Sequence, residues 1–271
     1  MDAIPTNSTL KNLADSGDPV AQFNLGKMFY NGIVVEKDLV KAVKWYLKSA
    51  EQGYVEAQFR LGQLYLRGEG LEQDYEEAAK WIEKAAEQGH VKAQFTIGEM
   101  YYYGEGVLED KDEAIRWYRK SAEQGYPEAQ NGLGHMYFNG DGVQEDKVEA
   151  FKWFRKAADQ EFIKSQYNLG QMYYFGYGVD DDKVEAAKWY KKSAEQGYAK
   201  AQQNLGILYC IGEGVRHDYV EAYMWFSLAI MNRLDDAEDT GDLRNVLRKI
   251  FLSPSQIEEG EERVQKFLNR K

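Results

Sequence analysis

Three histidines and one cysteine are the side chains of this sequence best suited to hold a metal or attack a substrate. His90, His135 and His217 lie far apart, and none has a second ligand three or four residues away on the same helical face. This spacing predicts no metal site. Cys210 has no histidine positioned nearby to activate it, so we interpret it as a buried thiol.

Motifs that would carry catalysis or phosphate binding do not occur in the chain. It contains no G-x-S-x-G, P-loop or C-x-x-C sequence. Gly104-Glu105-Gly106 is glycine-rich, but the same pattern recurs along the chain as a turn between helices. The carboxylates fall at expected helix caps and on charged helix faces. We therefore expect a protein that is not an enzyme and uses no cofactor.

The charge balance restricts the classes of partner. The 271 residues include 45 acidic and 34 basic side chains, for a formal net charge of −11. Nucleic acids and anionic membranes both require cationic surface, so neither is an expected partner. No run approaches the ~20 apolar residues that span a bilayer. The sequence does not fix the oligomeric state, for which a monomer is the simpler expectation.

Features of the termini and the cysteine content indicate a compartment. A single cysteine cannot form an internal disulfide framework. The segment 1–8 has neither the basic nor the apolar region of a secretory signal. We expect a cytoplasmic protein.

Tryptophan recurs at intervals of 36 residues, and this period organises the whole chain. The six tryptophans are Trp45, Trp81, Trp117, Trp153, Trp189 and Trp225. Glycine and aspartate keep the same register, as Gly26 and Asp38 do in the first copy. A fixed period of this length is typical of a solenoid, in which each repeat buries its apolar surface against its neighbours. We predict six repeats, over residues 21–56, 57–92, 93–128, 129–164, 165–200 and 201–236, between a half-repeat cap at 1–20 and capping helices at 237–271.

The sequence pattern of each repeat predicts two helices. In the second copy an apolar stripe that includes Leu61 and Leu64 predicts a first helix, which Gly68 ends in the left-handed conformation. Asp74 is placed to cap the second helix, and Glu77 three residues later predicts a capping box. Lysines at two positions of the second helix are interpreted as a solvated face with glutamate partners.

Departures from the pattern mark particular repeats. The first copy has Val34 where the other copies have a second turn glycine, and the fourth copy has Glu161 where a second helix usually ends in glycine. Residues 8–17 match the end of a second helix. Apolar spacing after residue 242 predicts one more helix and then a final helix over about 254–269, with Ser253 as its cap.

The repeated pattern resembles the Sel-one-like repeat family, relatives of the tetratricopeptide repeats. The third copy carries it in Ala93-Gln94, Ile97-Gly98, Met100-Tyr101, Gly104, Gly106-Val107, Asp110, Ala114, Trp117-Tyr118 and Ala122-Glu123-Gln124-Gly125. The resemblance implies an all-α fold, a right-handed superhelix of antiparallel helix pairs that acts as a scaffold or adaptor for protein partners. Some bacterial members have a disulfide in each repeat, and this chain lacks those cysteines.

A second apolar row on the first helices exceeds what the core requires. An apolar face must be buried against something, either adjacent first helices or a partner. At Phe23, Phe59, Phe95 and Tyr167 we favour packing between helices. Further along the same helices we favour a concave, aromatic-rich groove. Its predicted residues are Tyr30, Arg67, Glu99, Tyr102, Tyr103, His135, Phe138, Asn139, Gln171, Tyr174 and Phe175.

The sequence thus favours a non-enzymatic adaptor that binds a peptide or protein segment in this groove. Two alternatives stay open. An inhibitor or immunity-type protein would clamp one enzyme, and the acidic charge would suit a basic target. A secreted effector would explain the acidic cluster Glu258, Glu259, Glu261 and Glu262, which a solvated helix face explains as well.

Overall fold

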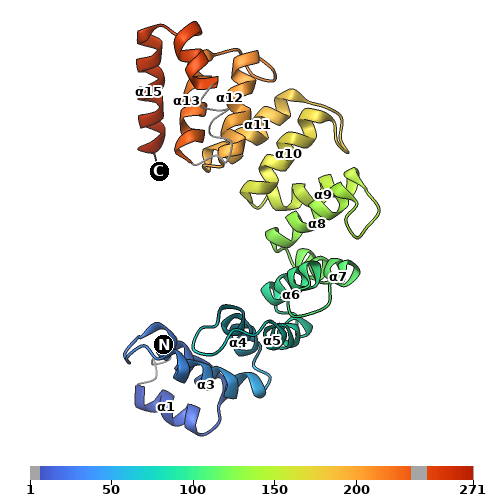
Figure 1. Cartoon of the computed structure of the whole chain (residues 1–271), viewed down its shortest axis with the longest axis vertical. Coiled ribbons are helices and arrows are strands. Elements are labelled where there is room, and N and C mark those ends of the chain that lie inside the picture. Colours follow the sequence, from blue (N-terminus) through green and yellow to red (C-terminus); the bar gives the residue numbers. More distant parts are fainter. Residues whose placement is uncertain (1–6, 233–242, 271) are drawn as a thin grey trace, which may run out of the picture. The chain divides into compact units, whose positions relative to one another are not determined.

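The structure is a computed structural model that describes residues 7–232 and 243–270. Over these residues it is helical, without a strand, and the helices follow one another in packed pairs (Figure 1). The helices are α1 (Asn7–Asp15), α2 (Pro19–Asn31), α3 (Leu39–Glu51), α4 (Val55–Arg67), α5 (Tyr75–Glu87), α6 (Val91–Tyr103), α7 (Lys111–Glu123), α8 (Pro127–Asn139), α9 (Lys147–Ala158), α10 (Ile163–Phe175), α11 (Lys183–Glu195), α12 (Ala199–Ile211), α13 (Tyr219–Met231), η1 (Leu247–Phe251) and α15 (Pro254–Leu268). By internal contacts the chain divides into two compact units, Met1–Ala129 and Gln130–Lys271.

The two helices of a repeat are held together where a glycine of the first helix meets a large side chain of the second. In the pair α10 and α11, a Cβ atom added at Gly170 would lie 2.5 Å from the ring of Tyr190. The equivalent contact recurs in every repeat. Its members are Gly26 with Tyr46, Gly62 with Ile82, Gly98 with Tyr118, Gly134 with Phe154, Gly170 with Tyr190 and Gly206 with Phe226. Only glycine lets the two helices approach this closely.

A buried glutamine at the start of each first helix ties consecutive helices together. The Oε1 atom of Gln58 accepts a hydrogen bond of 2.7 Å from Gln88, and its Nε2 atom donates to the carbonyl of Ala50 at 3.2 Å. One side chain therefore links the second helix of its own repeat to the second helix before it. The same pair of bonds forms at Gln22, Gln94 and Gln202. Each satisfies a buried amide, which would otherwise destabilise the fold.

The second glycine of the turn between helices marks a close approach of neighbouring repeats. A Cβ atom at Gly70 would lie 2.5 Å from the carbonyl oxygen of Leu39, and one at Gly214 would lie 1.9 Å from that of Lys183. No side chain fits there. Val34 occupies this position in the first repeat with φ of 68°, and 75% of its surface is exposed. Its exposure shows that no part of the described structure crowds the Val34 side chain.

The helix caps confirm half of the predicted capping arrangement and correct the other half. The Asp74 carboxylate accepts from the backbone N–H of Glu77 at 3.0 Å, as expected of an N-cap. The prediction of the reciprocal bond, from the Asp74 N–H to the Glu77 side chain, was wrong. Glu77 instead binds the ammonium of Lys80 at 2.7 Å, and the backbone N–H of Asp74 donates to the carbonyl of Tyr65. The complete capping box forms at Ser253 and Gln256, at the start of α15.

One of the two lysine rows on the second helices lies over tryptophan. The Lys120 ammonium lies 3.6 Å from the centroid of the Trp117 ring, a cation–π contact. Lys48, Lys84, Lys156 and Lys192 lie in the same way over the tryptophan three residues before them. The other row forms the expected glutamate pairs, as Lys80 does. A simple solvated face therefore describes only one row.

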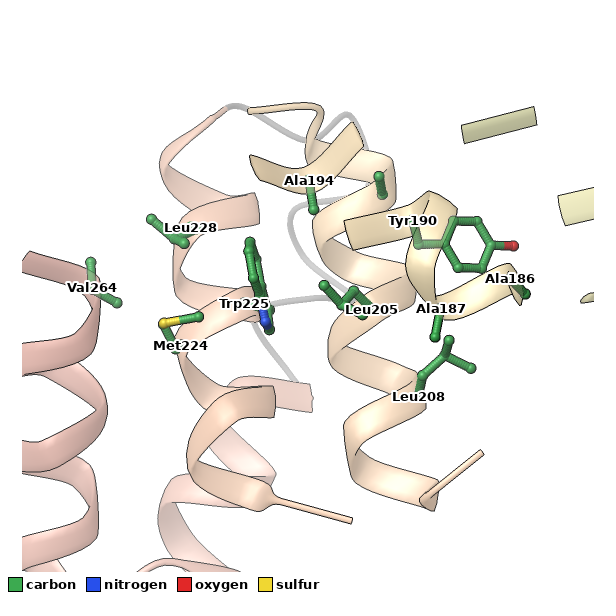
Figure 2. Close-up of a cluster of buried hydrophobic side chains, with 11 residues drawn as sticks. Ala186, Ala187, Tyr190, Ala194, Leu205, Leu208, Met224, Trp225, Leu228 and Val264 are labelled. Carbon is green, nitrogen blue, oxygen red and sulfur yellow. The ribbon is translucent and has the colours of Figure 1, made fainter. Parts of the chain in front are cut away.

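Additional helices cover both ends of the repeat array. The buried Ala14 of α1 accepts from Gln22 with its carbonyl, so α1 takes the place of a second helix. At the other end Val264 of α15 joins the core cluster of Trp225 and Leu228 (Figure 2). The helix expected after residue 242 is present over 243–246 and continues as the π-helical η1. The preceding residues, 233–242, lie outside the described part.

The glycine contact predicts that Gly170→Ala destabilises the protein by about 1–3 kcal/mol, because the added methyl group overlaps the Tyr190 ring. This loss opposes helix propensity, which favours alanine over glycine by about 1 kcal/mol. Urea unfolding of Gly170→Ala, Tyr190→Ala and the double variant measures the coupling. With the ring removed, Gly170→Ala should no longer destabilise. A loss of the same size in both backgrounds would contradict the contact.

The φ angle of Glu161, 63°, predicts a stabilising substitution. Glycine holds the equivalent left-handed position at Gly89 and Gly197, whereas a side chain there costs about 1–2 kcal/mol. Glu161→Gly should therefore raise the free energy of unfolding by about 1 kcal/mol, measured by thermal or urea melts. Glu161→Gln is the matched control, since it removes the charge but keeps the Cβ atom. Equal effects of the two substitutions would show that charge, not backbone strain, is responsible.

Candidate protein-interaction face

Six aromatic residues occupy two adjacent positions near the ends of the first helices, and we call them the aromatic row. They are Tyr30, Tyr102, Tyr103, Phe138, Tyr174 and Phe175. Tyr103 is 65% exposed and Phe175 is 54% exposed, whereas the other four are partly buried. Helices α6 and α10 thus bury one apolar stripe in the core and present a second, aromatic group to water.

Two tyrosines of the row bridge to the next repeat. The hydroxyl of Tyr30 donates to Glu69 at 2.7 Å, and that of Tyr174 donates to Glu213 at 2.9 Å. The hydrogen bond to a carboxylate raises the pKa of both tyrosines. Because these hydroxyls are already paired within the protein, the rings rather than the hydroxyls are available to a ligand.

In the second unit the row extends into a cluster of four rings, Phe138, Tyr174, Phe175 and Tyr177, which we call the aromatic cluster. Phe175 stacks on Tyr177 with centroids 5.4 Å apart, and Phe138 meets Tyr177 edge-on at 5.5 Å. Tyr174 meets Phe175 edge-on at 4.9 Å. Contacts of this kind fix the orientation of the rings.

Sequence reasoning missed Tyr177, which follows the glycine that ends α10. The equivalent residue is a carboxylate in four other repeats, Glu69, Glu105, Asp141 and Glu213. A tyrosine in place of a carboxylate was the available signal. It adds the stacked ring on which the exposed Phe175 rests.

The cations beside the aromatic cluster have nearby carboxylates. Lys147 lies 5.0 Å from the Tyr177 centroid and 3.2 Å from Glu145. Lys183 lies 4.2 Å from the Tyr174 centroid and 3.8 Å from Asp181. With Glu213, which accepts from Tyr174, the ring surface of the cluster is therefore bordered by charges of both signs.

The predicted polar residues of the first unit are charged. Arg67 is exposed and lies 3.7 Å from Glu69. Glu99 is partly buried, and its burial, together with the charges of Glu105 and Glu128, raises the pKa of this carboxyl. Near Tyr103, Glu99 and Glu105 therefore supply carboxylates.

The predicted polar residues of the second unit are uncharged amides and one histidine. Asn139 is exposed and Gln171 is partly buried. His135 lies edge-on to the Phe154 ring at 5.0 Å and 3.2 Å from the amide of Asn168. Partial removal from water and the charge of Lys164 lower the pKa of His135.

Rings at the other position of the first helices pack between helices. Phe23 lies 5.4 Å from Tyr46 and 5.3 Å from Tyr54. Tyr167 lies 5.2 Å from Tyr198, just before the next first helix. These contacts agree with the packing between helices that the sequence favours for Phe23 and Tyr167.

The remaining histidines and the cysteine have structural surroundings. His90 caps α6 by accepting from Ala93, and it lies over Phe59 at 4.4 Å between centroids. His217 lies edge-on to Tyr219. Burial raises the pKa of Cys210 to about 11, which keeps it as a thiol at neutral pH. No three metal-ligating side chains gather within residues 7–232 and 243–270.

Helix pairs of regular length, closed by glycine and joined by inter-repeat glutamines, define an α-solenoid of the helix-pair type. The sequence profile of the Sel1 repeat matches residues 19–54, 55–90, 91–126, 127–162, 163–198 and 199–233. This chain belongs to the Sel1 repeat family, whose repeats serve as protein-interaction scaffolds. None of the described helices has the length and hydrophobicity needed to cross a membrane.

Solved structures of the same family resemble the chain over most of its length. The protective antigen c5321 of uropathogenic Escherichia coli strains, which has an SLR fold, is 38% identical with a TM-score of 0.85. The match covers 96% of this chain and 56% of that one, so this chain spans little more than half of the antigen. A Sel1 repeat protein from Oxalobacter formigenes is 34% identical with a TM-score of 0.72, over 82% of this chain and 90% of that one.

A shorter match is found in a putative sel1-like repeat-containing protein of Acanthamoeba polyphaga mimivirus. It is 51% identical over 43 residues, which are 16% of this chain and 7% of the viral protein. A match of about one repeat in length confirms the repeat type.

The raised pKa of Glu99 predicts a pH-dependent effect on stability. Because the fold favours the protonated carboxyl, its stabilising contribution is present at low pH and is lost as the pH rises through the folded pKa. Glu99→Gln should therefore stabilise the protein at pH 7, and the difference should shrink at about pH 4. Urea melts at both pH values measure this. Glu123→Gln, at an exposed carboxylate that does not act on Glu99, is the control and should show a smaller difference.

Proposed function

We propose that this protein is a non-enzymatic scaffold that binds a segment of a partner protein on the aromatic row of its first helices. The observation that carries the proposal is the exposure of Tyr103 at 65% and Phe175 at 54% on helices whose cores are otherwise satisfied. Exposed rings grouped with other rings are typical of recognition surfaces.

The rings are oriented before a partner arrives. Tyr103 meets Tyr102 edge-on with centroids 4.8 Å apart, and Phe175 is held between Tyr174 and Tyr177. A preformed surface loses little conformational entropy on binding. Tyrosine and phenylalanine also supply large contact area from only two side-chain torsions.

The two units offer faces of different character, and we propose that each binds its own part of a partner. Tyr103 in the first unit stands in the same first helix as the acidic Glu99, with Glu105 just beyond the helix end. Phe175 in the second unit stands in the same helix as the amide of Gln171. A basic segment would suit the first face, and an uncharged apolar segment would suit the second.

Replacing Phe175 or Tyr103 by alanine, one at a time, tests the two faces. The partner is isolated by capture on the immobilised full chain and identified by mass spectrometry, and its affinity for each variant is then measured by titration. We expect a loss of about 2 kcal/mol in binding, roughly a 30-fold weaker Kd, at the face in use. The free energy of unfolding should fall by only about 1 kcal/mol, because both rings are largely exposed and lose one ring contact at Tyr103 and two at Phe175.

Leu108→Ala is the matched control, since this side chain is 90% exposed but lies outside the aromatic row. It should change neither affinity nor stability. If both ring variants bind the partner as the unaltered chain does, or if they unfold much more easily, the aromatic row is a packing feature and the proposal fails.

A further inference from the structure

A cavity of about 860 Å³ lies in the second unit between α11, α13 and α15, on surface that the aromatic row does not include. Met224, Trp225 and Phe267 supply its apolar lining. Its volume falls in the range of small-ligand sites, which is about 300–1,000 Å³.

The sixth repeat reverses the charge of the turn that borders this cavity. Arg216 and His217 precede the capping aspartate and line the cavity. The same two positions hold no arginine or histidine in the earlier repeats. They are Glu36-Lys37, Glu72-Gln73, Leu108-Glu109, Gln144-Glu145 and Asp180-Asp181.

The capping helix α15 adds further cations to the lining. Arg263, Lys266 and Arg270 all face the cavity, in a chain whose net charge is −11. Arg263 is held by Glu221 and Glu259, and Lys266 lies 3.3 Å from Glu262.

Two cations of the lining are not neutralised in this way. Neither Arg216 nor Arg270 forms an ion pair with any residue of the described segments, and both side chains are exposed. Two guanidinium groups are therefore available to an anion in a cavity whose lining combines charged side chains with Met224, Trp225 and Phe267. Guanidinium binds carboxylate and sulfonate groups through paired hydrogen bonds.

The tryptophan of this repeat is covered by a different residue type from the others. In the first five repeats a lysine three residues later lies over the indole ring. In the sixth repeat that residue is Leu228, which is buried in the core, and Phe267 meets Trp225 edge-on at 5.5 Å. Beside Trp225, which is 3% exposed, the ring of Phe267 therefore takes the place of the lysine that covers the tryptophan in the other repeats.

We propose that this cavity binds an organic anion that carries an aromatic or aliphatic group. The anionic group would bind Arg216 and Arg270, and the apolar group would lie against Trp225 and Phe267. Apolar side chains that lie beside charged groups able to fix the orientation of a ligand are a feature of small-ligand sites.

A matched pair of fluorescent probes tests the charge requirement on the full chain. 1-Anilinonaphthalene-8-sulfonate carries a sulfonate, and N-phenyl-1-naphthylamine has the same rings without it. Titration, read by energy transfer from tryptophan, should give saturable binding of the sulfonate at one site. Its Kd should be about tenfold lower than that of the neutral probe, the gain expected for two exposed charge contacts.

The double substitution Arg216→Gln/Arg270→Gln should weaken binding of the sulfonate about tenfold and leave the neutral probe unchanged. Lys152→Gln/Lys188→Gln is the matched control, because it removes two exposed cations that pair with glutamates on second helices. It should leave both probes unchanged. Equal affinities for the two probes, or an equal loss in both double variants, would overturn the proposal. Circular dichroism melts of each variant verify that it is folded.

Competition separates two sources of such an anion. Displacement of the bound sulfonate by 3-phenylpropionate would assign the cavity to a free small molecule. Displacement by N-acetyl-glycyl-phenylalanine with a free carboxylate, but not by 3-phenylpropionate, would assign it to a peptide terminus. Displacement by neither compound would overturn the ligand class.

Discussion

The contact between a glycine and one large side chain sets the geometry on which the rest of each repeat depends. Six copies retain the glycine, from Gly26 to Gly206, whereas its partner is tyrosine, phenylalanine or isoleucine. The shared requirement is therefore the missing Cβ atom, not the identity of the ring. Close approach of the two helices then brings the buried glutamine within reach of the helix on either side, as for Gln58. Packing, hydrogen bonding and repeat register follow from one small residue.

Much of this fold was predictable because the decisive signals are local and repeated. Glycine ends a first helix and aspartate begins a second one through contacts within a few residues, so Gly68 and Asp74 could be assigned from the sequence. The capping box failed for a different reason. Glu77 had two possible partners, and the choice between the Asp74 N–H and Lys80 depended on whether the Asp74 N–H was already bound elsewhere. Helical periodicity carries no information on that competition.

The candidate interaction face was predicted less completely. The 3.6-residue period of a helix places Tyr174 and Phe175 outside the main core stripe. It does not show that Tyr174 is partly covered and bound to Glu213 in the next repeat, since that contact crosses between repeats. Tyr177 lies in a turn, where helical periodicity gives no guidance. The internal comparison of six copies was the stronger tool, because a residue that departs from its five equivalents, such as Tyr177 or Arg216, has no role in the common scaffold.

The close approach at the second turn glycine decides which repeats can be placed after another repeat. A repeat that carries glycine there, such as the one with Gly178, can follow another repeat, because its backbone passes the carbonyl of the preceding second helix without a clash. The first repeat carries Val34, whose side chain would meet that carbonyl if a full repeat of the same geometry were placed before it. Lengthening the protein by duplication is therefore open to the interior copies and closed to the first. The exposed Val34 therefore disfavours the addition of a repeat before the first copy, but not after it.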